Sequence, residues 1–128
     1  MHALASQLPL KRFALVEELR EGDHLSPEKF IELMHLDITT FACNARVHRN
    51  TVSRAPASAG VQAHIRDNLR VLRAAFDLAD GDLDKAIVWF KNEPLSEFGY
   101  KTPETLVAEG RGDDLIALIE LYSAGALG

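Results

Sequence analysis

Residues Ala86 to Gly128, AIVWFKNEPLSEFGYKTPETLVAEGRGDDLIALIELYSAGALG, decide how this chain is organised. The stretch begins with an aromatic pair, Trp89-Phe90, then alternates helix-breaking residues with short apolar runs, and ends in a strongly periodic segment. Within it we find no nucleophile beside a base, no cluster of metal ligands and no glycine-rich phosphate loop. It therefore predicts a surface that another protein binds, and no catalytic centre.

The composition of the chain is that of a soluble globular protein. Its 128 residues include 47% hydrophobic and 26% charged residues, an ordinary balance for one domain or two small interlocked ones. No apolar run approaches the roughly 18 residues of a membrane span. The basic residues near the N-terminus follow a short apolar stretch, which is the reverse of an export signal. We therefore expect a cytoplasmic protein that does not associate with a membrane.

The net charge of −5 conceals an uneven distribution along the chain. The segment from Arg46 to Arg73 contains six arginines and a single acid, Asp67. From Phe76 onward, eleven acidic residues outnumber four basic ones. Because local electrostatic fields steer partners, the middle of the chain suits nucleic acid, whereas the acidic end should repel it.

Hydrophobic periodicity and helix-end residues predict an all-α fold. The clearest helix is residues 61–79, where apolar residues recur at spacings of four and three. The other expected helices are residues 10–20 ended by Gly22, 27–35 capped by Ser26, a helix around Phe41 capped by Asp37, one from about His48, 83–91 capped by Asp82, one from Pro103 ended by Gly110, and a last helix begun by Asp113 or Asp114.

The segment Leu36 to Arg54, LDITTFACNARVHRNTVSR, resembles the helix-turn-helix of phage-repressor-like proteins. In that family an apolar-Ala pair on the first helix packs under a second, recognition helix, and a Gly-Val-Ser turn joins the two. This chain keeps the pair as Phe41-Ala42, but Arg46 replaces the turn glycine and His48 replaces the capping serine. Both replacements weaken the turn signal, because Gly suits the left-handed position and Ser caps well.

A helix that lies in the major groove needs short polar and forked cationic side chains along one face. The residues that we predict to contact DNA are Arg46, His48, Arg49, Asn50, Ser53 and Arg54. The alternative is a solvated surface helix. Arg66, Arg70 and Arg73 recur along one face of the long helix, where they either extend the phosphate-contacting surface or form a solvated face.

From Trp89 to Gly125 the spacing resembles the toxin-binding domain of the Xre/MbcA/ParS antitoxin family. That family has an aromatic-capped helix, an Asn-x-Pro-Leu step, a Gly followed by x-x-Pro-x-x-Leu, and then a Gly and a final helix ended by Gly. The matching residues here are Trp89-Phe90, Asn92-Glu93-Pro94-Leu95, Gly99, Pro103, Leu106, Gly110, the run Leu115 to Tyr122, and Gly125.

The resemblance implies the antitoxin of a type II toxin-antitoxin system. In that family the C-terminal lobe covers the active site of a RES-domain toxin that degrades NAD, and the helix-turn-helix binds the operon's own operator DNA. The implied division is residues 1–60 as an N-terminal arm and helix-turn-helix lobe, 61–79 as a connecting helix, and 80–128 as a small helical toxin-binding lobe. The residues assigned to toxin contact are Trp89, Leu95, Tyr122, Ser123, Leu127 and Gly128. For Trp89, Phe90 and Leu95 the alternative is a place in the hydrophobic core.

Two other functions compete with the antitoxin. A free-standing transcriptional regulator would use the C-terminal lobe for dimerisation. Both functions imply a homodimer, because paired half-sites need two-fold symmetry, and an antitoxin would also form a larger hetero-oligomer with its toxin. An enzyme is disfavoured, since His24, His35, His48 and His64 lie on different predicted elements without metal-site spacing. We therefore expect no catalytic residues, no metal and no cofactor, and we expect Cys43 to be buried as a small hydrophobe.

Overall fold

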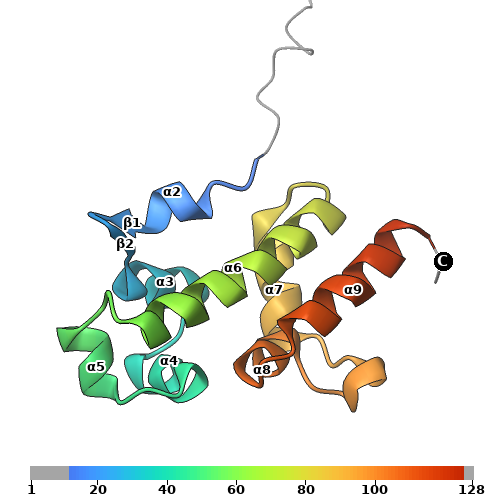
Figure 1. Cartoon of the computed structure of the whole chain (residues 1–128). Helices are drawn as coiled ribbons and strands as arrows, with labels where there is room; N and C mark the ends of the chain where they lie inside the picture. The colour runs from blue at the N-terminus through green and yellow to red at the C-terminus, as the bar shows by residue number, and fades with distance from the viewer. Residues whose placement is uncertain (1–11, 126–128) are drawn as a thin grey trace, which may run out of the picture.

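The computed structural model describes residues 12–125, and the fold is mostly helical, as predicted (Figure 1). The elements in chain order are α2 (Leu15–Leu19), β1 (Arg20–Glu21), β2 (His24–Leu25), α3 (Pro27–Met34), α4 (Ile38–Ala45), α5 (Arg49–Arg54), α6 (Ala59–Leu78), α7 (Leu83–Asn92), the 3-10 helix η1 (Ser96–Phe98), α8 (Pro103–Ala108) and α9 (Gly112–Ser123). The long helix α6 packs against α3, α4, α7, α8 and α9. It therefore organises the fold.

The N-terminal region differs from the sequence prediction. The first described helix ends at Leu19, and an antiparallel hairpin follows in which Arg20 pairs with Leu25. Gly22 has φ +64° and lies in the hairpin turn, so the prediction that it ends a helix was wrong. Positive φ suits Gly in both positions, and the choice depends on tertiary contacts, including the bond from the Ser26 amide to the Leu19 carbonyl at 2.8 Å.

Four of the predicted helix starts are confirmed by their caps, whereas the last helix begins at Gly112 without a side-chain cap and has Asp113 and Asp114 in its first turn. At each of the four capped starts a side-chain oxygen accepts a hydrogen bond from the backbone amide three residues later, which satisfies one of the unpaired donors of the first turn. The capping oxygens are those of Ser26 at 3.1 Å, Asp37 at 2.7 Å, Asp82 at 3.1 Å and Thr102 at 3.2 Å. At the other end of α3, Lys91 Nζ donates to the carbonyl oxygens of Met34 and His35, a cation placed where the helix dipole is negative.

A continuous hydrophobic core runs along both halves of α6. Its largest fully buried side chains include Phe30 and Phe41 from the N-terminal part and Phe90, Leu106 and Leu115 from the C-terminal part. Val71 and Leu72 of α6 belong to the same cluster. Helix α6 therefore lies in the main core from Val61 to Leu72, and near its end Ala75 and Phe76 pack with Ala86 in a second, small cluster. It is not an exposed linker.

Buried polar side chains fix the segments at the start of α6. The Gln62 side chain accepts from the Leu25 amide at 2.9 Å and donates to the carbonyl oxygens of Leu25 and Pro56, both at 2.8 Å. A buried polar group destabilises the fold unless it is paired, and Gln62 pairs with both neighbouring segments. The hairpin and the small-residue connector before α6 are thereby held against one side chain.

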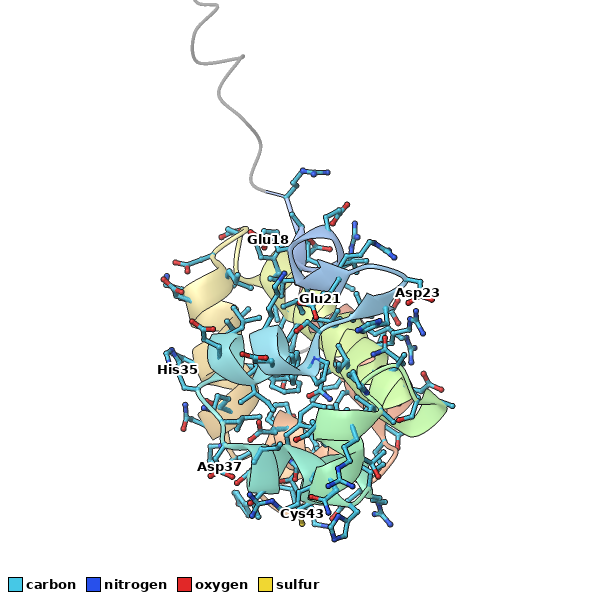
Figure 2. The ribbon with its side chains drawn as sticks, turned by 90° about the vertical axis from the view of Figure 1, so that its left-hand side faces the viewer. Glu18, Glu21, Asp23, His35, Asp37 and Cys43 are labelled. Atoms are coloured by element: carbon cyan, nitrogen blue, oxygen red, sulfur yellow. The ribbon has the colours of Figure 1, made fainter. Side chains whose placement is uncertain are left out.

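The expectation that Cys43 is buried was wrong. Phe41 and Ala42 are buried, but Cys43 is exposed and lies at the edge of the molecule in Figure 2. Successive helix residues point about 100° apart, so the residue beyond a buried pair turns toward solvent. An apolar sequence neighbourhood did not reveal this rotation.

Candidate nucleic-acid and partner interfaces

Helices α4 and α5, which cover the predicted helix-turn-helix, are joined by a tight turn that begins at Arg46. Arg46 has φ 59° and ψ 41°, the left-handed conformation, and the Val47 amide donates to the Ala42 carbonyl at 3.0 Å. A residue other than Gly is strained in this conformation. Here the Arg46 Nε also donates to the Ala108 carbonyl oxygen at 3.3 Å. The replacement of the usual glycine therefore leaves the turn intact and adds a contact to α8.

His48 caps α5 in place of the usual serine. Its backbone is extended, with φ −73° and ψ 144°, and its Nδ1 accepts a hydrogen bond from the Asn50 amide at 3.0 Å. Because Nδ1 is the acceptor, the neutral ring carries its proton on Nε2. His48 is the second residue that differs from the repressor pattern. Its imidazole nitrogen accepts the capping hydrogen bond that a serine hydroxyl would accept at this position.

The predicted DNA-contacting residues of α5 all lie on its exposed face. Val52 is buried at 4% exposure, whereas Arg49, Asn50, Ser53 and Arg54 are exposed, as are Arg46 and His48 before them. No described carboxylate lies within ion-pair distance of Arg49 or Arg54. The face therefore combines unpaired guanidinium groups, which bind phosphate or guanine, with an amide that suits adenine.

A close contact holds this helix pair against α6. Phe41 makes edge-to-face contacts with Phe30 at 5.7 Å and with the His64 ring at 5.4 Å between centroids. Burial lowers the pKa of His64 from 6.5 to about 4, which outweighs the opposing effect of the Asp67 charge. A Cβ on Gly60 would lie only 3.2 Å from Val47 Cγ1, so Gly60 permits the turn to approach α6. The orientation of α5 is set by the core.

Acidic residues border one side of α5. A cavity of about 450 Å³ is lined by residues of β1, α3, α4 and α5, among them Val52 and two exposed acids, Glu28 and Glu21. Glu21 Oε2 also lies 3.9 Å from Lys29 Nζ. These carboxylates disfavour a phosphate backbone on this side. The charge pattern thus favours nucleic acid on the arginine side of α5 and disfavours it beside α3.

The Asn-x-Pro-Leu step leads from the end of α7 into a closed loop that begins at Leu95. The Leu95 amide donates to the Lys101 carbonyl at 3.0 Å, and the Tyr100 amide donates to the Leu95 carbonyl at 2.8 Å. Gly99 has φ +68° within this loop. Leu95 is only 3% exposed and belongs to the core, so the structure does not offer its side chain to a partner.

The other residues assigned to toxin contact are placed differently from one another. Trp89 is half-buried and packs against the core. Tyr122 is half-buried, and its hydroxyl donates to Glu97 Oε2 at 3.0 Å. Desolvation and the neighbouring Glu97 raise the pKa of that hydroxyl. Ser123 is exposed, whereas the assignments to Leu127 and Gly128 lie outside the described residues.

Three apolar side chains of the C-terminal part are exposed, and two of them, Val88 and Tyr100, were missed as contact candidates. The three are Val88 on α7, Tyr100 in the loop and Leu121 on α9, with exposures of 60%, 70% and 48%. Acidic residues stand close in sequence to two of them, Asp84 to Val88 and Glu120 to Leu121. The sequence indicated the exposure of two of them, because Val88 and Leu121 fall outside the apolar stripes by which their helices face the core.

Within residues 12–125, no group of three His, Cys, Asp or Glu side chains is placed to hold a metal ion. None of the described helices combines the length and the apolar character that crossing a bilayer requires. Comparisons with protein-family models, with curated proteins and with solved structures found no match.

Proposed function

We propose that this chain is the antitoxin of a type II toxin-antitoxin system, which binds a RES-domain, NAD-degrading toxin and covers its active site. The chain also binds operator DNA and so controls its own expression. The observation that carries the proposal is the exposed face of α5, with Arg49, Asn50, Ser53 and Arg54 turned to solvent beside a turn of repressor type. The resemblance of residues 89–125 to the antitoxin family supplies the partner.

In this proposal the chain has two functional ends. Residues 1–60 contain the DNA-binding lobe, residues 61–79 form the helix that connects the two lobes, and residues 80–128 form the toxin-binding lobe. The main hydrophobic core contains residues from both parts of the chain, which supports a rigid connection between the two ends. A rigid connection would let the chain present both surfaces at once. The acidic C-terminal part favours a protein partner over DNA there. A homodimer joined to toxin in a larger hetero-oligomer completes the assembly.

Toxin contact is best assigned to the exposed apolar side chains of the C-terminal part. Exposed aromatic and aliphatic groups are the usual anchors of protein interfaces, and Val88, Tyr100 and Leu121 are exposed here. Ser123 and the half-buried Trp89 and Tyr122 remain in the proposed surface. Leu95 instead shapes the loop that presents Tyr100, since its backbone bonds to Tyr100 and Lys101.

Coexpression with the product of the adjacent gene tests the proposal. The neighbour alone should deplete cellular NAD, and coexpression with this chain should restore it and yield a complex that copurifies. If no complex forms and NAD stays level, the antitoxin proposal fails. The α5 face would then support the second candidate, a free-standing transcriptional regulator. That function predicts that the chain binds DNA and has no toxin partner.

A further inference from the structure

The outer face of α6 carries charged side chains in a symmetric order. Arg66, Arg70, Arg73 and Asp77 follow one another at alternating spacings of four and three, and Asp80 comes three residues later in the turn after the helix. All five are exposed. Within α6, residues at these spacings share one face of the helix, whereas Asp80 lies beyond the helix end, with φ 56°. Figure 1 views the molecule from the side on which no other helix covers α6.

The charged residues of this face are basic on the N-terminal side of Ala75 and acidic on its C-terminal side. Arg73 and Asp77 are equally far from Ala75 along the chain, and so are Arg70 and Asp80, with the basic residue always on the N-terminal side. Two copies of α6 packed antiparallel with a two-fold axis at Ala75 would bring Arg73 opposite Asp77 and Arg70 opposite Asp80. Each pair would occur twice, because a two-fold interface is self-complementary.

The arginines of this face border an apolar groove. The groove has a volume of about 330 Å³, and its floor is formed by Phe13, Val16, Leu25 and Leu69. Its charged rim is formed by Arg20, Arg66, Arg70 and Arg73. Arg70 Nη2 lies 2.7 Å from Asp113 Oδ1. No described carboxylate lies within ion-pair distance of the other three arginines, so the rim attracts an acidic partner.

Other occupants fit this face less well. Residues 1–11 contain no Asp or Glu, so they do not match the arginine rim. In both figures α2 and the hairpin lie across α6 from α4 and α5, so DNA bound at α5 would lie away from this groove. We propose that the outer face of α6 is the dimer interface of this chain, with Arg73 opposite Asp77 of a second copy and with Arg70, which also lies beside Asp113, opposite Asp80.

This inference gives the proposed homodimer a specific surface, but it does not depend on the antitoxin function. The interface contains none of the predicted DNA-contacting residues of α5. It also leaves Val88, Tyr100 and Leu121 outside the pairs described. Its test is the association state of the purified chain, which is read without NAD, toxin or DNA, so either proposal can fail while the other holds.

Sedimentation velocity of the full chain, with a charge swap, tests the interface. The unaltered chain should be a dimer whose dissociation constant rises with salt. Arg73→Asp and Asp77→Arg should each weaken it by at least about a hundredfold, because each reversal acts twice and places like charges together. The double variant Arg73→Asp/Asp77→Arg should restore most of the affinity. Lys85→Asp, an exposed reversal on α7, is the matched control and should change it less than about threefold.

Three results would overturn the proposal. The unaltered chain could stay monomeric at concentrations of about 100 μM, a range in which specific interfaces associate. A dimer that both single reversals leave intact would use another face. Single reversals that break the dimer without rescue by the double variant would contradict the register about Ala75. Circular dichroism of each variant checks that its helix content is unchanged.

Discussion

The Nε of Arg46 donates a hydrogen bond to the carbonyl oxygen of Ala108 across 3.3 Å and 62 residues of sequence. Arg46 is the left-handed residue that ends α4, and Ala108 is the last residue of α8. A helix leaves its final carbonyls without internal partners, so this bond satisfies one of them. It ties the turn of the helix-turn-helix to the C-terminal part and offsets some of the strain at Arg46.

Two substitutions at Arg46 separate this bond from the strain. Arg46→Ala removes the hydrogen bond and keeps a Cβ in the left-handed conformation, so it should lower the free energy of unfolding by about 1 kcal/mol. Arg46→Gly also removes the bond but relieves about 1 kcal/mol of strain, so its stability should stay close to that of the unaltered chain. Urea unfolding followed by circular dichroism measures both. If the Arg46→Ala variant has the same free energy of unfolding as the Arg46→Gly variant, the turn carries no backbone strain at this residue.

Burial of His64 makes stability depend on pH. Its pKa is about 4 in the folded chain, against 6.5 for a free imidazole. The unfolded chain therefore binds the proton more readily, and stability falls as pH drops from 6.5 toward 4. Between pH 7 and pH 5 the loss from this residue should be about 2 kcal/mol.

A comparison with His64→Gln isolates this contribution from the other titrating groups. Glutamine keeps a polar side chain beside Asn68, whose Nδ2 lies 3.2 Å from His64 Nε2, but it does not titrate. Urea unfolding at pH 7 and pH 5 should give a smaller loss of stability for the variant by about 2 kcal/mol. Equal losses in the two chains would mean that His64 is protonated in the folded state at pH 5.

Local signals made most helix boundaries predictable. A capping oxygen acts on an amide three residues away, so Ser26, Asp37, Asp82 and Thr102 identify helix starts without knowledge of the rest of the fold. The long helix was equally clear, because its inward stripe spans many turns. Helix caps and apolar stripes depend on residues within one segment, so they can be predicted from the sequence of that segment alone.

The features that sequence reasoning missed depend on distant contacts. Gly22 suits a helix end or a hairpin turn, and the hairpin is held by Gln62, which lies 37 residues from Leu25. Leu95 matches a partner-binding pattern but packs in the core. The exposure of the α5 face was predictable from residue type, whereas the bond from Arg46 to α8 was not, because neither residue signals the other in sequence.

DNA binding should depend on the two α5 arginines. Arg49→Ala/Arg54→Ala should weaken binding to a duplex from the region upstream of the gene by at least about tenfold, because each arginine binds a phosphate or a base. The slope of log affinity against log salt should become shallower by about 1 for each of the two arginines that contacts a phosphate. Anisotropy of a labelled duplex measures both, and Lys85→Ala is the control. Neutralisation of the toxin should persist, so an equal loss of both functions would contradict separate surfaces.

Toxin neutralisation should depend on the exposed end of α9. Leu121 is 48% exposed, so Leu121→Asp leaves the core intact but places a charge in the proposed interface, where an unpaired buried charge is strongly unfavourable. We expect the affinity for the coexpressed toxin to fall by at least about tenfold and NAD depletion to return, with duplex binding unchanged. Thr39→Asp, an exposed substitution on α4, controls for the added charge.

Removal of residues 123–128 tests whether the surface continues past α9. The deletion takes away the exposed Ser123 together with Leu127 and Gly128, and it should weaken neutralisation while DNA binding persists. Calorimetric titration of toxin with the shortened chain and with Leu121→Asp ranks the two contributions. If the deletion alone abolishes binding, the contact lies beyond α9 and the exposed apolar side chains are peripheral. If both variants neutralise as well as the unaltered chain, the toxin binds elsewhere, and Val88 and Tyr100 become the next residues to replace.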